Sequence, residues 1–278
     1  MAGDGELVVL CRGVYEENDE QNAYVKALKA AGYTCEFLRT LRFEFVNKSE
    51  LRKWLSMAHD YSGLILTSLR TVEAIALAVD EDTSILDHWK KLPAYCVGPA
   101  TESLAQSQLG LQCCIGGQLG NSQELAEKIA LDIKKDSKPL FYPCSEIARG
   151  TITDILRACN ITMHKLVVYK TLECESLGED LVKILKKYVD HPKMFVFFSP
   201  SIAEYFAAQL KKNFYSIMEI KAVAIGSVTR LAMYHYGFNL FAVAKKPEPA
   251  ALVEAITIAK SVVDAREYVV AADYVRIK

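Results

Sequence analysis

Small hydroxyl side chains and glycines recur at the turns that follow short apolar runs of the chain. The candidate site residues at these turns are Thr67, Ser68, Gly98, Thr101, Ser145, Ser199, Ser201, Gly226 and Thr229, together with the neighbouring Cys144 and Pro200. A glycine lets the backbone approach a ligand, and a hydroxyl either caps the next helix or bonds to the ligand. Because helix N-termini bind carboxylate or phosphate without basic side chains, the pattern predicts an anion site. The alternative at each position is a hydroxyl that only caps a helix.

The patterns of several other enzyme classes are missing. The chain has no Walker A, GxSxG or HExxH motif, and its five histidines lack metal-ligand spacing. GGxxG at 116–120 lacks the dinucleotide spacing, and the first loop, CRGVYE at 11–16, offers little for a nucleotide to bind. We therefore expect no metal and no nucleotide cofactor.

Cysteine usage and the first residues bear on the cellular compartment. The eight cysteines contain no CxxC pair, and residues 1–6 are acidic, with no apolar stretch. These features favour reduced thiols and no signal peptide, so we expect a cytosolic protein.

Alternating apolar runs and helical stretches must position the candidate residues. We predict strands over residues 7–10, 33–38, 63–66, 95–97, 111–115, 140–142, 163–169, 194–198, 222–225 and 240–243. Helical periods between them indicate an α/β protein with parallel sheets. The 278 residues allow one large or two ordinary domains. A net charge of −1 excludes a strong bulk field for nucleic acid, and no apolar run reaches membrane-spanning length.

The sequence also repeats itself at an offset of 127 to 131 residues. Ser68 with Glu73 matches Ser199 with Glu204, and GxxT at 98–101 matches GxxT at 226–229. LxExI recurs at 125–129 and 252–256. The pattern favours a duplicated α/β domain over coincidence. Two arrangements stay open: two consecutive domains, or a chain that crosses twice, near 38–44 and 168–174, so that 43–167 is inserted.

Seven segments together resemble a known family. They are DYSGLILTS at 60–68, VGPAT at 97–101, GNSQELAE at 120–127, PLFYPC at 139–144, VYKT at 168–171, FFSPS at 197–201, and AIG at 224–226 with Thr229. Their order and spacing are similar to uroporphyrinogen-III synthase, the cyclising enzyme of tetrapyrrole synthesis, over about residues 7–260. Leu69 and Ser227 stand where the family usually has proline, and the segment after Cys144 is less basic, although Arg149 remains.

The resemblance implies two flavodoxin-like lobes joined by a two-stranded linker, with the site in the cleft between them. One lobe would be discontinuous, 1–38 plus 172–262, the other would be 43–167, and 263–278 would be a tail. The implied reaction closes linear hydroxymethylbilane to uroporphyrinogen III with loss of water and inversion of ring D, through a spiro-pyrrolenine intermediate and without cofactor or metal. The implied partner is the bilane, handed over by the preceding deaminase. The resemblance implies no binding to nucleic acid or to a membrane. We expect a monomer.

Site roles follow from this resemblance. Tyr169 matches the family's tyrosine at the end of a predicted strand and is the candidate general acid; the alternative is a ring packed in the hinge with its hydroxyl on a carbonyl. Thr229 is the second candidate catalytic residue. Arg70 and Arg149 join the turn residues as candidate substrate contacts. Two rival functions stay open: a non-catalytic two-lobed module that binds a polyanionic small molecule, and a doubly wound methyltransferase or nucleotide enzyme.

Overall fold

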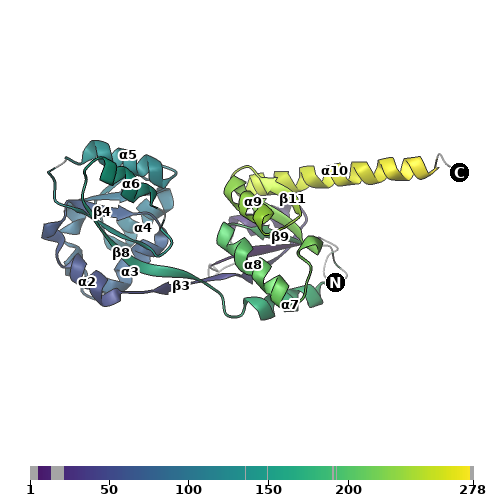
Figure 1. The fold of residues 1–278 in the computed structure, drawn as a ribbon, viewed down its shortest axis with the longest axis horizontal. Helices are drawn as coiled ribbons and strands as arrows, with labels where there is room; N and C mark the ends of the chain where they lie inside the picture. Colours follow the sequence, from purple (N-terminus) through teal and green to yellow (C-terminus); the bar gives the residue numbers. More distant parts are fainter. Residues whose placement is uncertain are drawn as a thin grey trace. The chain divides into compact units, whose positions relative to one another are not determined.

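The computed structural model describes residues 6–13, 22–134, 136–148, 150–189, 191 and 193–275, with side chains described up to residue 263. The chain divides into two units (Figure 1): Met1–Arg42 with Leu172–Lys278, called unit 1, and Phe43–Thr171, called unit 2. It passes from one to the other within β3 (Leu41–Phe45) and again within β8 (Met163–Glu173).

Unit 2 is built on a sheet whose described strands run in the order β3-β8-β7-β4-β5-β6. Its other strands are β4 (Gly63–Leu66), β5 (Pro93–Cys96), β6 (Cys113–Ile115) and β7 (Leu140–Ser145). The pairs from β8 to β6 are parallel. One face packs on α2 (Lys48–Leu55), α3 (Leu69–Val79) and α4 (Pro99–Leu109). The other face packs on α5 (Ser122–Asp132) and α6 (Thr151–Ala158), so both faces are buried, as parallel sheets require.

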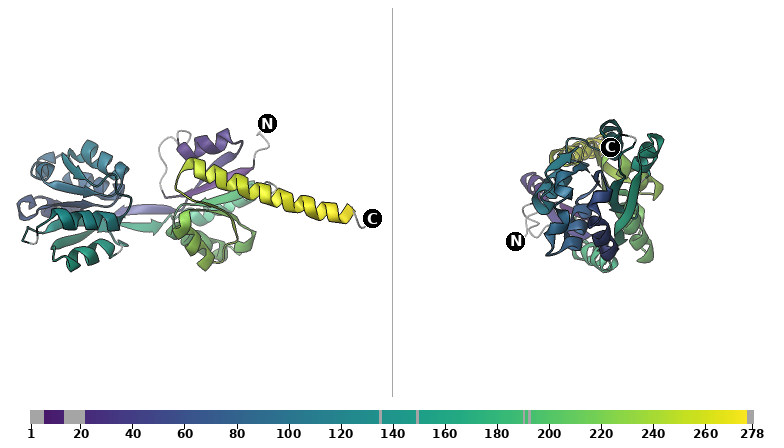
Figure 2. Two further views of the ribbon diagram at one scale, coloured as in Figure 1. Left: turned by 90° about the horizontal axis from the view of Figure 1, so that it is seen from above. Right: turned by 90° about the vertical axis from the view of Figure 1, so that its left-hand side faces the viewer.

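Unit 1 has a parallel sheet in the order β11-β10-β9-β1-β2 among the described residues. The strands are β1 (Leu7–Arg12), β2 (Thr34–Arg39), β9 (Lys193–Phe197), β10 (Lys221–Ile225) and β11 (Leu240–Ala244). One face packs on α1 (Ala23–Ala30) and α10 (Pro249–Val275). The other packs on α7 (Leu177–Lys187), α8 (Pro200–Lys212) and α9 (Gly226–His235), and Figure 2 shows helices on both sides of the strands.

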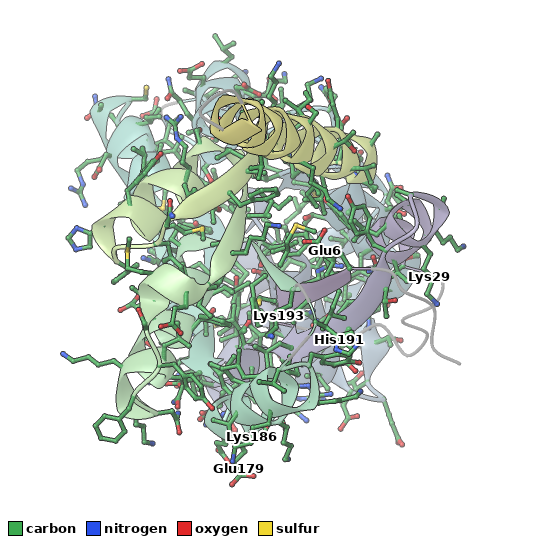
Figure 3. All side chains as sticks on the ribbon, turned by 90° about the vertical axis from the view of Figure 1, so that its right-hand side faces the viewer. Glu6, Lys29, Glu179, Lys186, His191 and Lys193 are labelled. Atoms are coloured by element: carbon green, nitrogen blue, oxygen red, sulfur yellow. The ribbon has the colours of Figure 1, made fainter. Side chains whose placement is uncertain are left out.

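Two ammonium groups fasten α10 and β10 to the start of β1. The Glu6 carboxylate lies 2.9 Å from Lys221 Nζ and 2.6 Å from Lys260 Nζ, and Figure 3 shows Glu6 beneath α10. Burial of Glu6 opposes its ionisation, but the hydrogen bonds from Lys260 and Lys221 outweigh it and hold the pKa of Glu6 below its ordinary value. This cluster joins the last helix to the sheet.

The two sheets, in which parallel pairs dominate, confirm the predicted α/β class. Residues 41–45 were not predicted as a strand, yet they form β3. Tyr169 was predicted to end its strand, and this is wrong, because β8 continues to Glu173. The reason is tertiary: Val46 N donates to Val168 O and Cys174 N donates to Thr40 O, so this backbone is bonded beside β3 as well as β7. Within the described residues, no helix is long and apolar enough to span a lipid bilayer.

Candidate functional site

A cavity of about 600 Å³ opens at the C-terminal ends of the central strands of unit 2. Its lining residues are Thr67, Ser68, Val97, Gly120, Asn121, Ser122, Gln123, Tyr142, Ser145, Ile147, Ala148, Thr151, Tyr169 and Thr171. The volume falls within the usual range for small-molecule sites. Parallel α/β sheets bind their ligands at this edge, because strand-to-helix loops present backbone N–H groups there.

Among the described residues, three helices begin at this cavity. The Ser68 side chain caps α3 and accepts from Thr71 N, and the Asn121 side chain caps α5 and accepts from the N–H groups of Gln123 and Glu124. Helix α6 begins at Thr151 with no side-chain cap. Each helix start carries roughly half a positive charge and N–H groups without partners inside the helix.

None of the described side chains that line the cavity is charged. Glu124 in the first turn of α5 accepts from Gly120 N and Asn121 Nδ2, and Asp154 lies in the first turn of α6, whereas the first turn of α3 holds no acidic residue. Hydroxyl and amide side chains supply further hydrogen-bonding groups. The arrangement suits a carboxylate or phosphate group more than a cation or an apolar ligand.

Two phenols lie at the cavity. Tyr169 Oη is 3.0 Å from Ser68 Oγ, and the Tyr169 ring packs edge-on against Phe43. Because Ser68 Oγ already accepts from Thr71 N, it has its own proton to give; when it donates to Tyr169, the phenol proton is free for a ligand. Burial raises the pKa of Tyr142 to about 12 against a hydrogen bond from Thr67, so this phenol is protonated at neutral pH.

The turn after β7 is fixed by hydrogen bonds around Ser145. Its Oγ accepts from Ile147 N at 3.3 Å, and its carbonyl accepts from Ala148 N at 3.1 Å. Glu146 N donates to the carbonyl of Tyr169 at 3.1 Å, which ties the turn to β8. The start of α6 and the Tyr169 phenol are thereby held beside one cavity.

The structure brings four predicted residues together at this cavity: Thr67, Ser68, Ser145 and Tyr169. The Tyr169 hydroxyl bonds to Ser68 rather than to a carbonyl, unlike the alternative drawn from sequence. Tyr142 was not predicted as a site residue, because an aromatic residue in a buried strand has the pattern of a core residue. Asn121, which also lines the cavity, was not predicted as a site residue either.

Other predicted residues of unit 2 do not line the cavity. Arg70 forms an ion pair with Glu73 at 2.5 Å, and its guanidinium lies 4.8 Å from the Phe43 ring centre. Gly98 and Thr101 belong to the start of α4. The Cys144 thiol donates to Leu166 O in the core, and burial raises its pKa to about 11. Arg149 lies outside the described residues.

The predicted residues of unit 1 lie at the C-terminal edge of its sheet, after β9 and β10. Ser199 caps α8 by accepting from Ile202 N, and Pro200 and Ser201 are the first residues of that helix. Gly226 begins α9 with a φ of +78°, and Thr229 is buried within that helix. Two helices thus begin side by side along neighbouring strands of unit 1.

A family model described as uroporphyrinogen-III synthase HemD matches residues 22–254. The chain belongs to the uroporphyrinogen-III synthase family. The uroporphyrinogen-III synthase of Saccharomyces cerevisiae is 26% identical over 211 residues, which are 70% of this chain and 75% of the yeast protein.

Solved structures of the family share the fold. A mutant uroporphyrinogen III synthase from Thermus thermophilus has a TM-score of 0.56 and 14% identity, covering 92% of this chain and 99% of that one. The synthetase from Helicobacter pylori has a TM-score of 0.56 and 19% identity, covering 93% and 99%. Among the described residues, no group of three or more His, Cys, Asp or Glu side chains is placed to hold a metal ion.

Proposed function

We propose that this chain cyclises linear hydroxymethylbilane to uroporphyrinogen III, with loss of water and inversion of ring D. Membership of the uroporphyrinogen-III synthase family supports the reaction. The observation that carries the proposal to this chain's own residues is the cavity at α3, α5 and α6. Its helix N-termini and uncharged polar lining fit the acetate and propionate groups of such a substrate.

The chemical demand on the protein is mainly orientation. The bilane closes unaided to the non-inverted isomer, so the enzyme must hold it folded with the substituted carbon of ring D as the attacking atom. Fixing reacting atoms in this way is worth several kcal/mol. Rigid donors serve this purpose, and the turn after β7 and the cap of α3 are both fixed by short-range hydrogen bonds.

Tyr169 is the proposed proton donor to the departing hydroxyl. Its phenol lies at the cavity, and in the direction in which Ser68 Oγ donates, their hydrogen bond stabilises the phenol oxygen when the phenol proton is given to the substrate. Thr229 was the second catalytic candidate. Because it is buried within α9, we propose a structural role for it instead.

The direct test is incubation with enzymatically generated hydroxymethylbilane, followed by separation of the product isomers. We expect the type III isomer to exceed the type I isomer in proportion to the amount of protein. A buffer sample and a heat-inactivated sample give the unaided type I background. An isomer ratio equal to those controls would refute the synthase proposal, and product binding without a changed ratio would favour the two-lobed binding module.

We also propose a cytosolic location, a monomeric state and delivery of the bilane by the preceding deaminase. All eight cysteines lie among the described residues and are free thiols, which supports a reducing compartment. Fractionation of cells and light scattering of the purified protein test the first two proposals. The third proposal, delivery by the deaminase, is tested in an assay that couples both enzymes, where the measured quantity is the loss of unbound bilane from solution.

A further inference from the structure

Arg12 is the last residue of β1, at the C-terminal edge of the unit 1 sheet. Its guanidinium carbon lies 4.9 Å from the Phe198 ring centre and 5.8 Å from that of Tyr24. The two rings meet edge to face at 5.0 Å, so they form one rigid support. Two cation–π contacts therefore fix the position of this cation.

Arg12 has no acidic partner in the part of the chain that the structure describes. By contrast, Arg52, Arg70 and Arg157 pair with Asp82, Glu73 and Asp154. The backbone carbonyl of Arg12 accepts from Thr40, but no described residue accepts a hydrogen bond from the guanidinium N–H groups. A guanidinium stacked on aromatic rings uses its faces, which leaves the N–H donors in its plane for a ligand.

The surroundings of Arg12 favour an anion. β1 pairs with β9, and β9 pairs with β10, so Arg12 shares the sheet edge with the starts of α8 and α9. Phe198, which supports the guanidinium, directly precedes Ser199, the cap of α8. Arg12 as a whole is half-buried, so a carboxylate bound to it would be partly shielded from water.

We propose that Arg12 binds a carboxylate of the tetrapyrrole through its guanidinium, as a subsite of unit 1 additional to the cavity of unit 2. This inference rests on the proposed function for the identity of the ligand. The geometry suits a bidentate bond to one acetate or propionate group. Sequence alone gave no sign of this role, because the first loop, CRGVYE at 11–16, lacks the serine and threonine side chains of the other turns.

The test combines kinetics with equilibrium binding. We expect Arg12→Gln to raise KM for hydroxymethylbilane ten-fold or more with kcat within two-fold of the unaltered protein. Arg12→Lys keeps the charge without the fork of donors, so its KM should fall between the two. Arg157→Gln removes the same charge from an exposed position on α6 and should leave KM unchanged. Uroporphyrin III, titrated by fluorescence quenching, should bind Arg12→Gln at least ten-fold more weakly, and its methyl ester should not distinguish the two proteins.

The outcomes separate the two proposals. A KM and a uroporphyrin affinity within two-fold of the unaltered protein in Arg12→Gln would overturn the subsite, whether or not the unaltered protein makes the type III isomer. Weakened uroporphyrin binding supports the subsite even if the isomer assay refutes the synthase. Should Arg12→Gln fail to fold, Phe198→Leu keeps the charge but removes one supporting ring, and an unchanged KM in it would likewise count against a fixed guanidinium.

Discussion

Replacing Tyr169 by phenylalanine removes one oxygen from the cavity and leaves the ring against Phe43. The lost contact is the 3.0 Å bond to Ser68, so we expect the free energy of unfolding to fall by about 0.5–1.5 kcal/mol. Tyr169 as a whole is 8% exposed, and a phenylalanine ring fills nearly the same volume. The variant should therefore fold normally and keep its isomer selectivity, which depends on how the substrate is held.

The effect on turnover distinguishes two roles of the phenol. A neutral hydrogen bond worth about 0.5–1.5 kcal/mol in the transition state corresponds to roughly 2–13-fold in rate. Full general acid catalysis is worth about 10²–10⁴-fold. We predict a fall in kcat of about ten-fold or more. Because the pyrrole nitrogen itself expels the hydroxyl, a fall near ten-fold means a hydrogen bond to the leaving group, and one above a hundred-fold means proton transfer.

Tyr61→Phe is the matched control. Tyr61 is also buried in unit 2, and its hydroxyl lies 3.3 Å from His164 Nδ1, away from the cavity. It should lose similar stability with unchanged kcat. Single-turnover measurements with freshly generated bilane separate the chemical step from product release. Full turnover in Tyr169→Phe would refute the proton-donor reasoning and leave substrate folding as the enzyme's whole contribution.

Three further predictions concern both units. Ser199→Ala should raise KM only a few-fold in steady-state kinetics. It should lower the free energy of unfolding by about 1 kcal/mol in urea, because the α8 cap is lost. A thousand-fold loss of kcat would instead indicate that Ser199 is a nucleophile. Glu6→Gln should be less stable than the unaltered protein at neutral pH. Because the folded-state pKa of Glu6 is lowered, its contribution exists above the unfolded-state pKa and is lost as pH falls through the folded-state pKa, so the two melting temperatures should converge in acid. With a pKa near 11, the Cys144 thiol should react with iodoacetamide at pH 8 only after unfolding, and rapid labelling of the native protein would contradict its burial.

Local chemistry explains which parts of this structure could be predicted. Gly32, Gly110 and Gly237 lie at the ends of α1, α4 and α9, and each has a positive φ that glycine adopts readily. Ser68 and Ser199 were expected at helix starts, and both cap their helices. These signals depend on a few neighbouring residues, so they can be recognised in the sequence.

Features that depend on partners distant in the sequence could not be predicted from the sequence. The extension of β8 past Tyr169 needs bonds beside β3, which is distant in the sequence, although the alternation LRFEF at 41–45 is itself typical of a strand. Tyr142 differs from a core tyrosine only in facing a cavity that three separate helices enclose. The support of Arg12 by Phe198 joins residues 186 positions apart, which no local pattern can reveal.

The discontinuity of unit 1 has a consequence for the order of events during synthesis. β1 pairs with β2 and also with β9, whose residues follow the whole of unit 2 in the chain. As the polypeptide leaves the ribosome, the sheet of unit 2 can be complete once Thr171 has emerged, while β1 and β2 still lack β9, β10 and β11. Until then, the buried residues Leu7 to Cys11 form an unpaired apolar strand edge exposed to other chains. Slow translation or a truncated message would prolong this state, so nascent chains ending between Leu172 and Lys193 should bind chaperones through β1.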